Sequence, residues 1–112
     1  MTIIYTFSFI ATAGTTLFFQ YPFISGSKVS MVSVSPTSTS KPIYVGCYTQ
    51  SNNQDHVVWL FSNTAVYHNA RLQKSAQWQG NLVIPNELTN LIIVYSNNTP
   101  NTIPLQGSIL YE

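Results

Sequence analysis

Hydrophobic and polar residues alternate along most of this 112-residue chain. In the first such stretch, single residues separate Ile3, Tyr5, Phe7 and Phe9. A period of two, carried by aromatic and β-branched side chains, predicts a β-strand with one drier face over residues 2–11. On similar grounds further strands are predicted over residues 16–21, 28–35, 43–49, 56–62, 64–69, 82–84, 91–95 and 105–111.

Turn-forming residues separate these stretches. Gly14, after Ala13, predicts a turn that joins the first two strands as a hairpin. The proline-bounded, Ser/Thr-rich residues 36–42 predict a loop, and residues 51–55 predict a polar turn. Asn63, after Ser62, predicts a tight connection between two strands. Residues 70–77 have too few apolar partners at helical spacing, so they are predicted to form a loop.

Two of the predicted strands depart from simple alternation. In residues 28–35 the apolar phase shifts between Met31 and Val32, which predicts a β-bulge or a bend at that point. Residues 57–61 form a continuous apolar run, which is typical of a strand that is covered on both faces. Trp59, in the middle of this run, is therefore expected in the hydrophobic core.

The spacing of these elements indicates the fold class. Eight or nine short strands with turn signals between them, and almost no helix, favour an all-β protein. The expected architecture is a two-sheet antiparallel β-sandwich, jelly-roll-like, with about eight strands. We expect residues 1–112 to form a single domain of this kind.

Charge is scarce, and this excludes one class of partner. Only 6% of the residues are charged, against about 25% in an average soluble domain. The polar surface must therefore consist mainly of neutral hydroxyl and amide groups, with little self-repulsion between copies, so association with neighbours is expected. The 4 basic residues are scattered, so the sequence predicts no direct contact with nucleic acid.

The first 27 residues carry no charged side chain. A signal peptide needs a basic region before its apolar stretch, but the first basic residue here is Lys28. Threonines and Gly14 interrupt the stretch, so no transmembrane helix is expected. Cys47 is the only cysteine, which excludes an internal disulfide, and its apolar strand predicts a small buried side chain.

Groups for catalysis are few, and no catalytic residue is predicted. His56 and His68 are the only histidines, and Asp55 and Glu87 are the only carboxylate side chains away from the C-terminus. A paired-carboxylate site would require two separate loops to converge. A metal site from His56, His68 and Glu87 has no supporting spacing, so neither a metal nor a cofactor is expected.

Binding chemistry is better represented than catalysis. Trp78 lies between Gln77 and Gln79 in a predicted loop, which places a flat apolar ring between neutral hydrogen-bonding groups. With Tyr67 or Tyr48 these residues would form a carbohydrate-binding surface. The alternative is that Trp78 packs its ring against the end of the sandwich. Residues 97–99, Asn-Asn-Thr, match the glycosylation acceptor pattern, although Pro100 follows them.

The strand pattern resembles that of the single jelly-roll coat proteins of icosahedral viruses and phages. The segments that carry the resemblance are residues 3–10, 29–34, 43–48, 57–61, 91–95 and 109–111. The resemblance implies a structural, non-enzymatic virion subunit that assembles with copies of itself and with other coat proteins. Because a basic arm is absent, it implies a penton, minor coat or spike-base role. The alternative is a carbohydrate-binding β-sandwich located outside the cell or at its surface.

Overall fold

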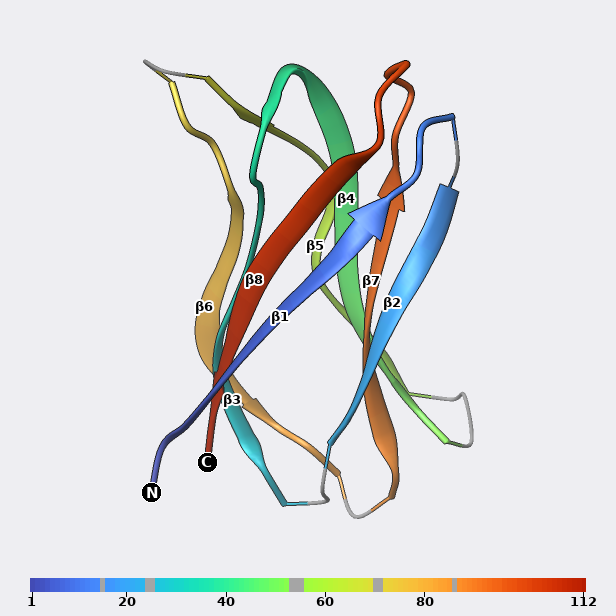
Figure 1. The fold of residues 1–112 in the computed structure, drawn as a ribbon. Helices are drawn as coiled ribbons and strands as arrows, with labels where there is room; N and C mark the ends of the chain where they lie inside the picture. Colours follow the sequence, from blue (N-terminus) through green and yellow to red (C-terminus); the bar gives the residue numbers. More distant parts are fainter. Residues whose placement is uncertain (15, 24–25, 53–55, 70–71, 86) are drawn as a thin grey trace.

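The computed structural model describes residues 1–14, 16–23, 26–52, 56–69, 72–85 and 87–112. Two antiparallel sheets of four strands face each other in this part of the chain (Figure 1). The strands are β1 (Ile3–Ala11), β2 (Thr16–Phe23), β3 (Lys28–Pro36), β4 (Thr39–Ser51), β5 (Val57–His68), β6 (Ala76–Val83), β7 (Thr89–Ser96) and β8 (Ile103–Tyr111). The predicted all-β sandwich with about eight strands is confirmed. No helix that could cross a membrane is found among the described residues.

The strand order is that of a jelly roll. One sheet has the order β1-β8-β3-β6 and the other β2-β7-β4-β5, so most connections cross from one sheet to the other. Only β4 and β5 are both consecutive and paired. The predicted hairpin of the first two strands is wrong, because β1 pairs with β8 and β2 pairs with β7. The turn at Gly14, whose φ is 70°, carries the chain between the sheets.

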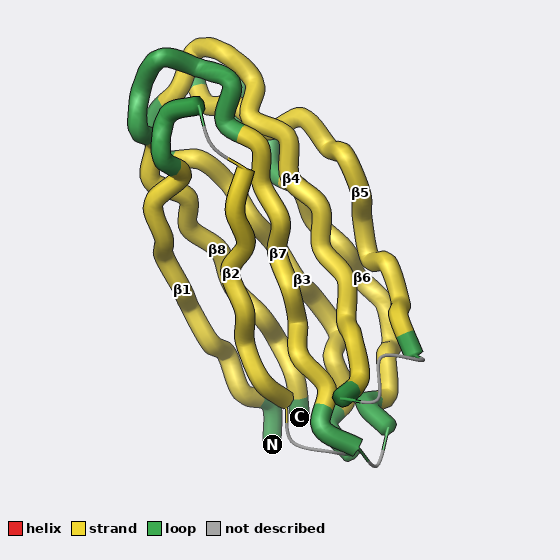
Figure 2. The backbone as a smooth tube through the Cα atoms, turned by 90° about the vertical axis from the view of Figure 1, so that its right-hand side faces the viewer, coloured by secondary structure: helices red, strands yellow, loops and turns green. Residues whose placement is uncertain are grey.

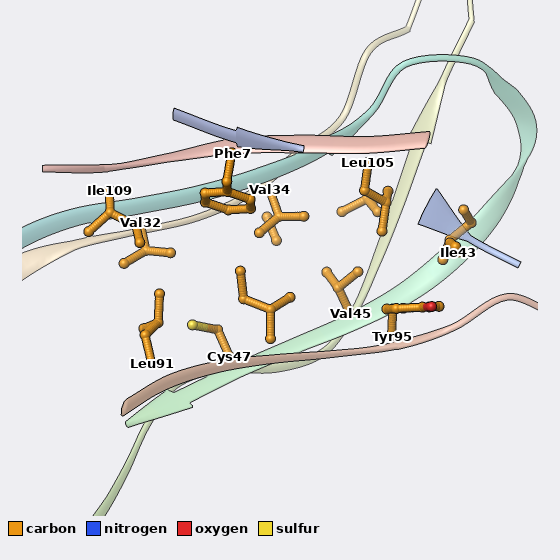
Figure 3. Close-up of a cluster of buried hydrophobic side chains, with 14 of the residues drawn as sticks. Phe7, Val32, Val34, Ile43, Val45, Cys47, Leu91, Tyr95, Leu105 and Ile109 are labelled. Carbon is orange, nitrogen blue, oxygen red and sulfur yellow. The ribbon is translucent and has the colours of Figure 1, made fainter. Parts of the chain in front are cut away.

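The core lies between the two sheets and is built from alternate residues of each strand. Figure 3 shows side chains from both sheets pointing toward one another. The first sheet contributes Phe7, Val32, Val34, Leu105 and Ile109, and the second contributes Ile43, Val45, Cys47, Leu91 and Tyr95, all of them buried. The prediction for Cys47 is confirmed: the thiol is buried, and desolvation raises its pKa to about 12.

Several predicted loops belong to strands. β3 ends at Pro36 and β4 begins at Thr39, so most of the predicted loop over residues 36–42 belongs to strands. Asn63 does not end a strand; it adopts a φ of 50° inside β5, where the pairing with β4 also shifts register. In β3 the register shifts between Val29 and Met31, close to the predicted bulge. Local turn residues thus bend strands here without ending them.

The run from Val57 to Trp59 is not buried. β5 is an edge strand that pairs only with β4, and all three residues of the run are exposed. The prediction that Trp59 belongs to the core is therefore wrong. A continuous apolar run has two explanations, since it also fits a strand at an edge whose outward side chains form part of an apolar surface.

A pair of tyrosines joins the two sheets. The hydroxyls of Tyr21 in β2 and Tyr111 in β8 lie 2.8 Å apart and share a hydrogen bond. The rings of Tyr21 and Tyr5 are also close, with centroids 4.4 Å apart. Burial, followed by the hydrogen bond to Tyr111, raises the pKa of Tyr21 to about 12. The neutral phenol is thus favoured in the folded chain.

This raised pKa predicts a loss of stability at alkaline pH. The unfolded chain releases the Tyr21 proton near pH 10, whereas the folded chain keeps it to about pH 12, so the free energy of unfolding should fall across that interval. Cys47 acts in the same direction. Urea unfolding at pH 8, 10 and 11 should show a smaller decrease for Tyr21→Phe than for the wild type. The exposed Tyr44→Phe is the control; equal decreases in wild type and Tyr21→Phe would contradict the prediction.

Candidate interaction surfaces

The residues predicted to bind sugar are not brought onto one face. Gln77, Trp78 and Gln79 lie in β6, not in a loop, so consecutive side chains point to opposite sides. Trp78 is opposite Val32 and packs against the core, as in the alternative interpretation, while Gln77 and Gln79 are exposed. Tyr67 lines a different hollow, beside His68 and Lys74.

The titratable residues do not assemble into a catalytic constellation. His56 Nδ1 lies 2.7 Å from Glu87 Oε1, so the imidazole donates a hydrogen bond to the carboxylate, with both side chains open to solvent. His68 is at the opposite end of β5, and Asp55 lies outside the described residues. Among the residues that the structure describes, no group of three His, Cys, Asp or Glu could hold a metal ion.

The outer side of the sheet β2-β7-β4-β5 carries an aromatic surface that the sequence interpretation missed. Trp59 and Tyr48 are cross-strand partners whose ring centroids lie 4.6 Å apart. Trp59 is 53% exposed. Its indole lies over Gly46: a Cβ atom added at position 46 would be 3.2 Å from Trp59 Cζ3. A hollow of about 280 Å³ adjoins this point. We call the set Tyr44, Gly46, Tyr48, Trp59, Ile92 and Val94 the aromatic face.

Neutral amide groups border the aromatic face. Gln20, Gln50 and Asn90 come from three neighbouring strands and, with Asn52, line a second hollow of about 340 Å³. Tyr48 and Ile92 line this hollow too, so it is continuous with the aromatic face. None of the described residues that line the two hollows is charged. The whole surface is therefore apolar at one end and polar but uncharged at the other.

A second candidate surface is the free edge of β1. Its nine residues pair with β8 without a register shift and include no proline and no charged side chain. Ile4 is 66% exposed and Ile10 is 53% exposed, and Ile3 is exposed beside them. Natural proteins usually protect an edge strand with lysine, proline or a bulge. We call Ile3, Ile4 and Ile10 the β1 flank.

The β1 flank and the aromatic face were not identified from the sequence. Their residues were assigned to strands, but strand assignment does not say which strands lie at an edge. One signal was available in the sequence: residues 3–11 contain three isoleucines and no charge, which is unusual for an edge. No comparable local signal marks Trp59, because its exposure depends on where β5 lies in the sheet.

Comparison with known proteins finds similar structures but no protein that is similar in sequence. No protein-family model matches the chain, and no curated protein matches it in sequence. A chain from the cyanophage Pam1 capsid asymmetric unit has a TM-score of 0.61 at 15% identity, over 98% of this chain and 83% of that chain. A chain from the capsid of Helicobacter pylori bacteriophage KHP30 has a TM-score of 0.52 at 13% identity, over 99% and 92%.

A chain of the infectious bursal disease virus Gx strain has a TM-score of 0.55 at 15% identity, over 99% of this chain. This chain spans only 33% of that viral chain, but most of the two phage chains. The protein therefore shares the jelly-roll fold found in viral and phage capsid structures. The predicted resemblance to jelly-roll coat proteins is confirmed at the level of fold.

Proposed function

We propose that this protein is a structural subunit of a virion coat. The observation that carries the proposal is the jelly-roll fold of this chain, which is similar in structure to chains of viral and phage capsids. This chain covers 83% and 92% of the two phage chains, so a jelly roll of about this size has parallels in phage capsids. A minor coat, penton or spike-base subunit is the role proposed, without catalytic activity.

The surface of the molecule supports assembly through its flanks. Figure 2 shows β1 and β5 at opposite sides of the sandwich. Both are edge strands with exposed apolar side chains, which are Ile4 and Ile10 on β1 and Val57 and Val58 on β5. Contact between different flanks of successive copies closes into a ring when the rotation allows it. With few charges on the whole chain, the proposed partners are copies of this chain and other coat proteins, and not nucleic acid.

Charging the β1 flank should prevent assembly. The wild type is expected to form a closed oligomer, and Ile4→Lys with Ile10→Lys should be monomeric, because a lysine at an exposed edge blocks pairing with a neighbour. Both side chains are exposed, so the fold should persist. The measurement is native mass by light scattering behind a sizing column, across a range of protein concentration.

Leu72→Lys is the matched control, because Leu72 is an exposed apolar residue outside the strands. It should leave the native mass of the oligomer unchanged. A wild type that stays monomeric at the highest concentration would contradict self-assembly. An oligomer that survives the two lysines on β1 would show that another surface forms the contact.

A further inference from the structure

The strand register orders the aromatic face and its amide border into two rows. One row crosses all four strands of the sheet through Gln20, Ile92, Tyr48 and Trp59. The next row crosses the same strands through Pro22, Asn90, Gln50 and Val57. Three inter-strand spacings make each row about 14 Å wide, and neighbouring rows are about 7 Å apart. An extended ligand of a few rings could lie along them.

The chemistry of the two rows differs in a way that matches a sugar. A pyranose ring has an apolar C–H face, which packs on aromatic rings such as those of Trp59 and Tyr48. Its hydroxyls each donate and accept a hydrogen bond, and an amide side chain offers both functions at once. Among the described residues, the side chains of Gln20, Gln50 and Asn90 make no hydrogen bond within the protein. Their amides are available to a ligand.

We propose that the aromatic face and its amide border bind a neutral oligosaccharide. The absence of charged side chains among the described lining residues favours an uncharged ligand over an acidic glycan or a phosphate. Trp59 supplies the stacking platform beside Tyr48, and Gln50 with Asn90 binds hydroxyls of the next ring. This site replaces the set around Trp78, which the alternation of β6 divides between two sides of the sheet.

A second copy of this chain fits the surface less well. A protein partner that covered it would remove Gln20, Gln50 and Asn90 from water, and each amide left without a partner costs about 1 to 3 kcal/mol. The hydroxyls of a sugar can form a hydrogen bond with each of these amides separately. The amides also line a hollow of about 340 Å³. A sugar ring can enter this hollow, whereas the flat face of another β-sheet would leave it empty. The proposal does not depend on the β1 flank.

The test uses tryptophan fluorescence as a direct report on Trp59. In a Trp78→Phe background Trp59 is the only tryptophan, and it is titrated with neutral hexasaccharides of glucose, mannose and N-acetylglucosamine, and with an acidic galacturonate oligomer. At least one neutral oligosaccharide should give a saturable change. Calorimetry on the otherwise wild-type chain should then show affinity for that sugar falling about tenfold or more in Trp59→Ala and about fivefold in Gln50→Ala.

Leu72→Ala is the control, because it removes an exposed apolar side chain away from the site and should leave the affinity unchanged. Melting curves for each variant separate loss of binding from loss of fold. The proposal is overturned if no neutral oligosaccharide binds, if Trp59→Ala binds as tightly as the wild type, or if the acidic oligomer alone binds. Loss of self-association in Trp59→Ala without any sugar binding would instead identify the face as a contact between copies.

Discussion

Asn97→Ala is expected to lower the free energy of unfolding by about 2 to 4 kcal/mol. The Asn97 side chain is fully buried in the connection from β7 to β8. Its Nδ2 donates to the carbonyl oxygens of Ala11 and Asn101, both at 2.9 Å. Its Oδ1 accepts from the Thr99 backbone N–H at 3.0 Å and from the Thr99 hydroxyl at 2.7 Å. Alanine removes all four bonds and leaves buried partners unsatisfied.

The connection that Asn97 stabilises holds the two sheets together at one end of the sandwich. Ala11 is the last residue of β1, in one sheet, while Asn97 follows β7, in the other. The backbone N–H of Gly14 also donates to the carbonyl oxygen of Asn97, at 2.9 Å. Residues 97–99 match the glycosylation pattern, but both amide hydrogens of the acceptor are engaged inside the protein. We therefore interpret this asparagine as structural.

Asn98→Ala is the matched control for this prediction, because Asn98 is the exposed neighbour in the same connection. It should change the free energy of unfolding by less than about 0.5 kcal/mol. Urea titration monitored by circular dichroism measures both variants. A free energy for Asn97→Ala within that margin of the wild type would show that the hydrogen bonds contribute little.

Except for β6, most of which was predicted as a loop, the strands could be predicted from sequence because each of them has a face in the core. Alternation along residues 3–9, for example, follows directly from Phe7 pointing inward and Thr6 and Ser8 pointing outward. The pairing could not be predicted in the same way. Ile3 pairs with Tyr111, at the other end of the chain, and no local feature of either segment encodes that contact. Fold class was therefore accessible, while strand order needed the structure.

The candidate sites show the same difference between what could be predicted from sequence and what needed the structure. The sequence interpretation placed Trp59 in the core, and for Trp78, in a predicted loop, it left open a binding surface or packing against the end of the sandwich. In the structure Trp78 packs against the core from β6, as one of the two interpretations had it, whereas Trp59 is exposed on β5. Reversing a strand's two faces moves every side chain to the other side, so a correct strand assignment can still give the wrong surface.

Gly107→Ala is expected to cost about 3 kcal/mol or more, or to prevent folding. Gly107 lies in β8, between β1 and β3, and faces Phe7 on one strand and Val34 on the other. A Cβ at this position would overlap the backbone carbonyl oxygen of Ser33 and lie 2.5 Å from Phe7 Cζ. The carbonyl belongs to a strand paired on both sides, so it cannot move without breaking the ladder. An isolated glycine in a strand fits such a close approach.

Gly46→Ala provides the matched control, since it places the same methyl group in a central strand of the other sheet. There the nearest atoms are Trp59 Cζ3 and Val94 Cγ2, both at 3.2 Å, and both belong to side chains that can shift. Its cost should be about 1 kcal/mol or less. Phe7→Leu combined with Gly107→Ala should recover only part of the loss, because the smaller side chain relieves the ring contact but not the overlap with Ser33. Full recovery of the unfolding free energy in that double variant would show that the ring, and not the backbone of β3, requires glycine at position 107.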